Sequence, residues 1–230
     1  MLAISSVNAS PRIAEHLRVG CSTGFMTSSR GDWPALVREA EAISTSAVEL
    51  AALSESELPS LVRYLRERPS LPFQYVSLHA PSKGRSMEER DLIELLYRLS
   101  PRVDAIVVHP DTLIEVEAWG RLGRRLVIEN MDARKPVGQT ADSLAEYFDV
   151  LDEARLCFDV AHAWAVDPTL QEGAEILDRF GARLRQLHVS SLDEGQHHVP
   201  LTAEHESLFG QLLDRCRDVP WILEAPLRQD

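Results

Sequence analysis

Short apolar runs alternate eight times with longer amphipathic stretches along this chain, and this alternation limits the possible folds more than any other feature. Runs such as IVV, LVI, LCF and WIL are typical of parallel strands buried on both faces. No stretch rich in Pro and Gly divides the pattern. Strands that alternate with helices indicate βα units around a parallel sheet, and eight such units predict a single (β/α)8 TIM barrel.

The pattern assigns each strand and most helices to a segment of the sequence. The expected strands are Arg18–Gly24, Ala47–Ala52, Phe73–His79, Ala105–His109, Leu126–Glu129, Arg155–Asp159, Gln186–Val189 and Trp221–Glu224. Helical patterns lie between them in WPALVREAEAI, SELPSLVRYLRER, EERDLIELLYRL, TADSLAEYFDVL, EGAEILDRFGARL and ESLFGQLLDRC. The segment LIEVEAWGRLG fits a helix less well.

A length of 230 residues is in the usual range of one α/β barrel domain. We expect the barrel to span residues 18–230 and residues 1–17 to be a loosely packed leader, because the opening lacks the basic start and long apolar middle of a secretory signal. No apolar stretch approaches the roughly 18 to 20 residues that a bilayer requires, so we expect a cytoplasmic protein that does not associate with membranes.

Cysteine content and charge restrict the chemistry further. Cys21, Cys157 and Cys216 are odd in number and far apart, which favours buried thiols over disulfides or a CxxC metal site. The formal net charge of −12 argues against a broad basic surface, so nucleic acid is a less favoured partner than a small molecule. The pattern makes no prediction about the oligomeric state.

Potential metal ligands stand at or just after the ends of six predicted strands, in HAP, HPD, ENMD, DVAH, HVSS and EAP. The ends of barrel strands point into the C-terminal mouth, where barrel enzymes have their active sites. Helix capping or a structural hydrogen bond explains any one such residue, but not the whole set at one rim. The set, including one histidine from the loop after the seventh strand, is His79, His109, Glu129, Asp159, His162, His188, His198 and Glu224.

Imidazole and carboxylate ligands suit zinc, manganese or magnesium, and iron is compatible with them. A cluster of Glu129, Asp159 and Glu224 would repel itself strongly unless protons or cations occupied it. The sequence therefore predicts a divalent metal site at the mouth.

These motifs resemble those of the xylose isomerase-like TIM barrel superfamily, which includes sugar phosphate isomerases and epimerases and the endonuclease IV family. LCFDVAHAW is the most specific of them, and VIENMD, RQLHVSS and WILEAPL resemble the other ligand strands of that superfamily. The resemblance implies that Glu129, Asp159, His188 and Glu224 bind a central metal.

The resemblance extends to further metals. His79 and His109 resemble the histidines that hold a second metal with a shared glutamate in endonuclease IV. For a third metal, His162 and His198 match that family's histidines, but Gln196 stands where an aspartate is expected. Asp193 or His197 is a possible substitute within the same loop.

Two loops and one aromatic residue are candidates for substrate binding. The loop APSKGRSMEER offers Lys83 and Arg85, and the loop NMDARKPVGQT offers Arg134 and Lys135; these loops hold the only two lysines of the chain. Solvated loop charge is the alternative. Trp164 could stack on a sugar ring or pack against its own loop.

The same ligand set is compatible with two mechanisms. In the favoured one, a metal-dependent isomerase or epimerase acts on a small sugar or sugar phosphate through a metal-stabilised enediolate, with Glu129 and Glu224 transferring the proton and His162 orienting the substrate. The alternative is an endonuclease IV-like phosphodiester hydrolase with two or three metals. A barrel that binds a metal or a sugar without turnover, or an iron-dependent oxidase, also stays open.

Overall fold

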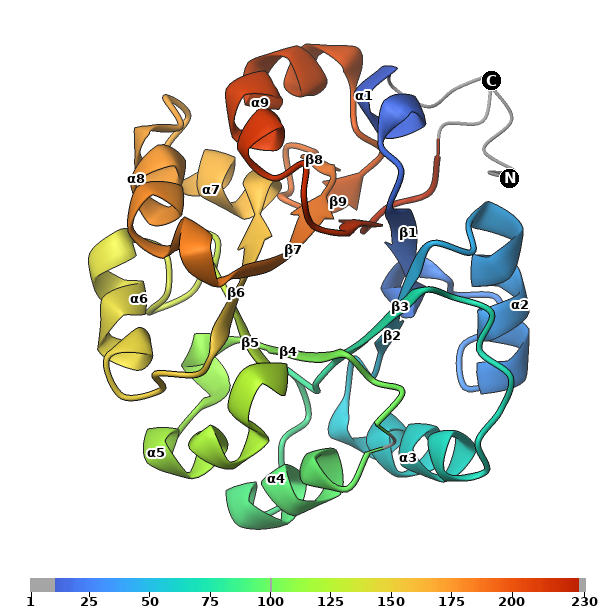
Figure 1. The fold of residues 1–230 in the computed structure, drawn as a ribbon. Helices are drawn as coiled ribbons and strands as arrows, with labels where there is room; N and C mark the ends of the chain where they lie inside the picture. Colours follow the sequence, from blue (N-terminus) through green and yellow to red (C-terminus); the bar gives the residue numbers. More distant parts are fainter. Residues whose placement is uncertain (1–10, 100, 228–230) are drawn as a thin grey trace.

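The chain folds into a closed barrel of eight parallel strands surrounded by helices (Figure 1). The computed structural model describes residues 11–99 and 101–227. The strands follow the order β1-β10-β7-β6-β5-β4-β3-β2, and β1 pairs with both β2 and β10 to close the sheet. The barrel strands are β1 Val19–Ser22, β2 Ala47–Ala51, β3 Tyr75–His79, β4 Ala105–Val108, β5 Leu126–Glu129, β6 Arg155–Asp159, β7 Leu184–Val189 and β10 Trp221–Leu223.

All eight expected strands are present, and their ends differ from the expected ones by no more than two residues. The prediction of a (β/α)8 TIM barrel is therefore confirmed. The helices are α1 Pro11–Glu15, α2 Trp33–Ile43, α3 Leu58–Arg66, α4 Glu89–Tyr97, α5 Val116–Trp119, α6 Ala141–Phe148, α7 Val160–Val166, α8 Gln171–Phe180 and α9 Ala203–Arg215. The poor helical pattern after β4 corresponds to α5, a single helical turn that continues into the 3-10 segment Gly120–Arg125.

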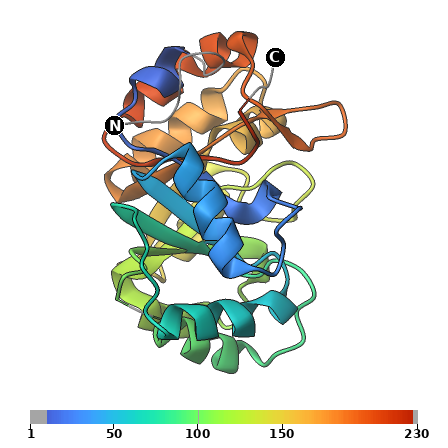
Figure 2. The ribbon, with the colours of Figure 1, turned by 90° about the vertical axis from the view of Figure 1, so that its right-hand side faces the viewer.

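Three elements differ from the expectation. Helix α7 was not expected, because VAHAWAV is almost uniformly apolar and shows no helical periodicity. An antiparallel hairpin of β8 Ser191–Leu192 and β9 His198–Val199 was not expected either, since strands of two residues carry no pattern. This hairpin extends from the barrel at the upper right of Figure 2.

The third difference concerns the expected leader. Residues 1–10 of it lie outside the described part of the chain, but residues 11–15 form α1, and Ile13 is buried in the main core. His16 stacks on Trp221 with ring centroids 4.3 Å apart, and Arg12 pairs with Asp214 of α9, which lies beside α1 in Figure 1. Packing thus begins before residue 18.

Two apolar layers support the barrel. The larger lies between the strands and the surrounding helices and includes Trp119 and Phe158. The smaller fills the barrel interior and consists of Ala47, Tyr75, Ala105, Val107, Val127, Cys157 and Ile222. Close strand approach also requires Gly20, because a Cβ there would lie 2.1 Å from the carbonyl oxygen of Ala47. Of the helices in residues 11–99 and 101–227, none is long and apolar enough to cross a bilayer.

Two buried carboxylates hold the loops around the mouth. Glu89 at the start of α4 accepts hydrogen bonds from the backbone N–H groups of Ile114 (2.9 Å) and Glu115 (2.6 Å) and from the Trp119 indole (2.9 Å). Glu55 accepts bonds from the backbone N–H groups of Ser86 and Met87 in the same way. Burial opposes ionisation of Glu89, but its donors outweigh burial and lower the pKa of this carboxyl.

Replacing Glu89 with Gln is expected to lower the free energy of unfolding by about 2 to 3 kcal/mol near pH 7, because an amide nitrogen would face donors that need an acceptor. Because the pKa of Glu89 is lower in the folded protein, the difference in unfolding free energy between variant and wild type is largest above the unfolded pKa of about 4.3. This difference disappears as the pH falls through the folded pKa. Urea unfolding from about pH 7 to pH 3 measures this, with exposed Glu88→Gln as the control. A constant difference at all pH values would contradict this account.

Candidate active site

The eight side chains selected from the sequence gather at the C-terminal end of the barrel. Six of them line a hollow of about 410 Å³ at this mouth. These six are His79, His109, Glu129, His162, His198 and Glu224. Asp159 and His188 have no exposed surface and belong to the same cluster.

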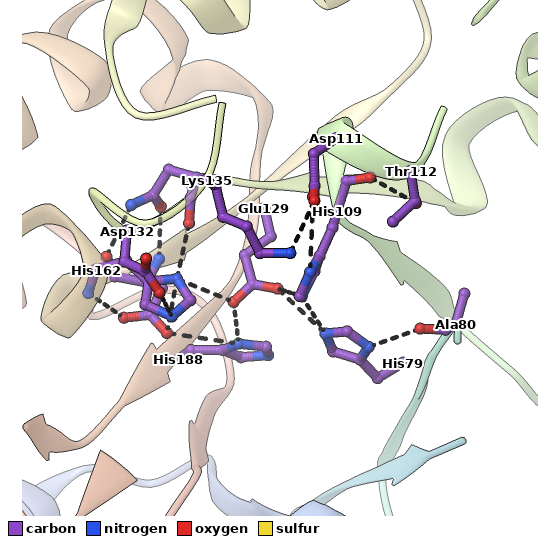
Figure 3. Close-up of polar contacts among 12 residues, drawn as sticks. His79, Ala80, His109, Asp111, Thr112, Glu129, Asp132, Lys135, His162 and His188 are labelled. Atoms are coloured by element: carbon purple, nitrogen blue, oxygen red, sulfur yellow. Dashed lines mark hydrogen bonds and ion pairs between the residues drawn. The ribbon is translucent and has the colours of Figure 1, made fainter. Parts of the chain in front are cut away.

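Glu129 is the centre of the cluster, as Figure 3 shows. Its Oε1 lies 2.9 Å from His188 Nδ1. Its Oε2 lies 3.2 Å from Nε2 of both His79 and His109. Burial lowers the pKa of His109, whose Nδ1 is buried and has no hydrogen bond. One carboxylate at the end of β5 thus contacts histidines from three strands.

Four side chains offer ligand atoms that lie within 4.8 Å of one another: Glu129, Asp159, His188 and Glu224. Nδ1 of His188 lies 3.3 Å from Glu224 Oε1, and 2.9 Å from Glu129. Burial and the neighbouring carboxylates of Asp159 and Glu129 raise the pKa of Glu224 well above its ordinary value. Three carboxyl groups in so small a volume favour an additional positive charge.

Two buried oxygen atoms without hydrogen bonds also indicate that the cluster favours an additional positive charge. Asp159 uses one carboxylate oxygen to cap α7, accepting a bond of 2.8 Å from the backbone N–H of His162. Its other oxygen, Oδ2, is buried and has no hydrogen bond, and the same holds for Glu224 Oε2. Buried carboxylate oxygens without a hydrogen bond fit a divalent cation, which binds such oxygens as ligands.

Three further groups of ligand atoms meet the same distance limit. One is His79, His109 and Glu129, another is Asp159, His162 and His198, and the third, Glu129, Cys157 and His188, is fully buried. Nδ1 of His162 lies 3.0 Å from the carbonyl oxygen of Asn130, so this nitrogen is the donor and Nε2 is free to be a ligand.

The β8–β9 hairpin determines which residues of the loop after β7 reach the ligand cluster. It brings His198 Nδ1 to 2.7 Å from Ser190 Oγ and 3.3 Å from Glu224 Oε2. Gln196 lines the hollow from a left-handed backbone position (φ 58°), and its buried Oε1 has no hydrogen-bond partner. Asp193 does not join the cluster, because its carboxylate accepts bonds from the backbone N–H groups of Gly195 and His197 within the turn. From this loop, Gln196, His197 and His198 therefore line the hollow, and Asp193 does not.

Three of the four basic residues named as substrate-binding candidates line the hollow: Lys83, Arg134 and Lys135. Arg134 makes two bonds to Asp132, at 3.1 and 2.7 Å. Lys135 Nζ lies 2.7 Å from Asp111 Oδ2. Both lysines of the chain are thus at the mouth. Arg85 lies elsewhere, against Glu55 and the carbonyl oxygen of Thr112.

Trp164 does not line the hollow. Its ring packs against His205, with centroids 4.4 Å apart, and against Phe209 of α9. Helix α7 directs the Trp164 side chain away from the mouth. The sequence pattern did not predict this helix. The structure therefore favours the packing alternative for this residue over sugar stacking.

Sequence reasoning missed Glu49, a fully buried residue in β2. Its Oε2 lies 3.0 Å from His188 Nε2 and 2.8 Å from Gln186 Nε2. Burial opposes its ionisation, but the adjacent His188 outweighs burial and lowers the pKa of Glu49 to about 2. The tyrosine hydroxyl of Tyr75 in turn donates to Gln186 Oε1 at 2.8 Å. The signal was a lone glutamate inside an apolar strand, AVELA.

Asn130 was also missed, although it follows Glu129 directly in the ENMD motif. Its side chain donates to the carbonyl oxygen of Asp159 at 2.9 Å and accepts from the backbone N–H of Asp159 at 2.7 Å. This pair of bonds fixes the end of β6 relative to the end of β5. Asn130 therefore sets the position of Asp159 relative to Glu129.

Two solved structures have a fold similar to that of this chain. The 3-keto-D-glucoside 4-epimerase of E. coli, in its apo form, has a TM-score of 0.53 and 13% sequence identity over 93% of each chain. An AP endonuclease, family 2, from Brucella melitensis has a TM-score of 0.52 and 12% identity over 90% of this chain and 92% of its own. No curated protein matches the sequence.

The family model described as xylose isomerase-like TIM barrel matches residues 112–229. This range contains Glu129, Asp159, His162, His188, His198 and Glu224, while His79 and His109 precede it. The matched segment is half of the chain, and the closed barrel agrees with it. The chain belongs to the xylose isomerase-like TIM barrel family.

Proposed function

We propose that this protein is a divalent-metal-dependent isomerase or epimerase that acts on a small sugar or sugar phosphate. The observation that carries the proposal is the group of Glu129, Asp159, His188 and Glu224 at the edge of an open hollow. These four residues would hold the cation. When bound, the cation would supply positive charge to two neighbouring substrate oxygens and so acidify the C–H bond between them.

Glu129 and Glu224 would move the proton. They come from the end of β5 and from the residue after β10, which are separated in the barrel by β6 and β7. One carboxylate removes the proton from carbon, and a carboxyl group returns one to the neighbouring carbon or to the same carbon on its other face. The raised pKa of Glu224 suits a group that must carry a proton near neutral pH.

The dimensions and charge of the hollow favour a small substrate. A volume of about 410 Å³ is in the range of small-molecule sites. Lys83, Arg134 and Lys135 provide a cationic edge for a phosphate or another anionic group. His162, with its ring fixed by Asn130, would orient a substrate hydroxyl.

A phosphodiester hydrolase is the second candidate, and a specific observation favours it. Groups of ligand atoms on both sides of the central four offer places for a second and a third cation. Gln196 opposes this candidate because an amide oxygen is a weaker ligand than a carboxylate for a cation held with His162 and His198. The two structural relatives include one enzyme of each kind, so the fold does not decide between them.

Proton transfer to carbon can be measured directly. In D2O, the enzyme is expected to introduce deuterium at the carbon beside the carbonyl of an accepted sugar, detected by NMR across a panel of ketoses and ketose phosphates. Glu129→Gln and Glu224→Gln are each expected to reduce this exchange by about 10² to 10⁴. Circular dichroism checks that both variants fold. Cleavage of an oligonucleotide with an abasic site, with no exchange into any sugar, would instead support the hydrolase.

Metal content separates the two candidates independently. Protein purified without chelator is expected to contain one ion per chain by plasma mass spectrometry, and anomalous diffraction should place it among the central four residues. His79→Ala should leave this count unchanged in a one-metal isomerase. Loss of a whole ion in that variant, from a starting content of two or three, would contradict the one-metal proposal.

Glu49 is expected to set the metal affinity through His188. With Nε2 of His188 bonded to Glu49, Nδ1 faces the central cluster, so the buried carboxylate fixes both the ring orientation and its basicity. Glu49→Gln should weaken metal binding by about 10- to 100-fold in a chelator competition titration. Exposed Glu41→Gln serves as the control. An unchanged metal affinity in a folded Glu49→Gln protein would refute this role.

A further inference from the structure

Four arginines line a second hollow, of about 450 Å³, at the opposite end of the barrel. They are Arg124, Arg125, Arg155 and Arg185. Arg124 and Arg125 directly precede β5, Arg155 is the first residue of β6, and Arg185 is the second residue of β7. Because all barrel strands are parallel, these positions share the N-terminal end, away from the metal ligands.

The strand geometry places two of these arginines at the floor of the barrel interior. Arg155 pairs with Val127 and lies two positions before Cys157, and both of those residues belong to the interior layer. Leu156 pairs with Leu184 while Cys157 pairs with Gln186, so Arg185 is the extra residue of a bulge. The bulge re-aims its side chain, and the guanidinium lies over the Tyr75 ring at 5.2 Å from the centroid.

The guanidinium groups have few acidic partners. Within residues 11–99 and 101–227, the side chain of Arg155 has no hydrogen bond or ion pair, and Arg185 has no carboxylate partner. Arg125 donates to the carbonyl oxygen of Tyr97, and Arg124 faces Glu153 at 3.5 Å where both side chains are largely exposed. The one carboxylate among the lining residues, Asp104, already accepts from the backbone N–H of Val76.

Four arginines around a hollow with one acidic lining residue concentrate positive charge in a protein whose formal net charge is −12. Their mutual repulsion is relieved by an anion with several acceptor oxygens. Guanidinium groups bind phosphate in a forked geometry that uses two oxygens each, so four such contacts require more oxygens than one phosphate group has. We propose that this hollow binds the oligophosphate group of a small molecule, independently of the reaction at the mouth.

Calorimetric titration of the full-length protein with inorganic pyrophosphate tests the proposal, with ionic strength held constant by NaCl to remove general screening. One pyrophosphate per chain is expected at this hollow, with orthophosphate binding there at least about tenfold more weakly. Titrations with ADP and ATP then show whether the natural ligand carries a nucleoside, because a bound nucleoside would increase the affinity over that of pyrophosphate. Absence of pyrophosphate binding would overturn the proposal.

Variants locate the binding site. The double variant Arg155→Gln/Arg185→Gln is expected to weaken pyrophosphate binding by at least about tenfold. The matched control is Arg63→Gln/Arg66→Gln, two exposed arginines on α3, and its affinity should be that of wild type. If the glutamine double variant does not fold, Arg155→Lys/Arg185→Lys replaces it, because lysine keeps the positive charge. Weaker pyrophosphate binding by the lysine variant would then reflect loss of the forked contact.

A mouth variant separates this site from the proposed metal centre, because pyrophosphate also chelates divalent metals. Glu129→Gln should bind pyrophosphate like the wild type. Loss of binding in Glu129→Gln together with normal binding in the arginine variant would place the anion at the mouth and overturn the proposal. Equal weakening in the α3 control would overturn it as well, since it would show nonspecific attraction.

Discussion

Closure of the sheet by the pairing of β1 with β10 is the constraint on which the rest of this structure depends. A closed parallel barrel leaves no unpaired strand edge and brings the ends of all eight strands to two small rims. Side chains distant in sequence, such as His79 and Glu224, therefore meet at one rim without any long loop. The close fit of Gly20 against Ala47 shows how little space this closure leaves between neighbouring strands.

The mouth concentrates negative charge, and its histidines compensate for only part of it. Glu129 is flanked by His188 on one side and by His79 and His109 on the other (Figure 3). Asp159 and Glu224 each retain a buried oxygen without a hydrogen bond. A cation would supply the charge that this arrangement lacks, and the residues present fit one. The metal-binding proposal thus follows from the electrostatics of this chain as well as from its family.

A continuous hydrogen-bonded column runs along the interior of the barrel between the two ends. Tyr75 donates to Gln186, Gln186 donates to Glu49, and Glu49 contacts His188, which faces Glu129. Buried polar groups of this kind are stable when each has a partner, and this one fixes the orientation of the central histidine. The guanidinium of Arg185 lies over the Tyr75 ring at the lower end of the column.

The sequence by itself determined the barrel, the strand positions and the residues that stand at the mouth. It could do so because continuous apolar runs and amphipathic stretches of period 3.6 are local properties, and because a strand-end residue must face the mouth once the barrel closes. The resemblance of LCFDVAHAW to the superfamily motif was likewise readable from a few adjacent letters, and the family model bears it out.

Only the tertiary structure decided what depends on distant partners. It placed Glu49 against His188, turned Trp164 toward α9, folded the loop after β7 into a hairpin and packed α1 against α9. It also grouped four arginines that the sequence scatters from residue 124 to residue 185. The physical reason is that hydrogen bonds and charge clusters between strands are set by register, bulges and closure, and none of these leaves a periodic trace in a single segment.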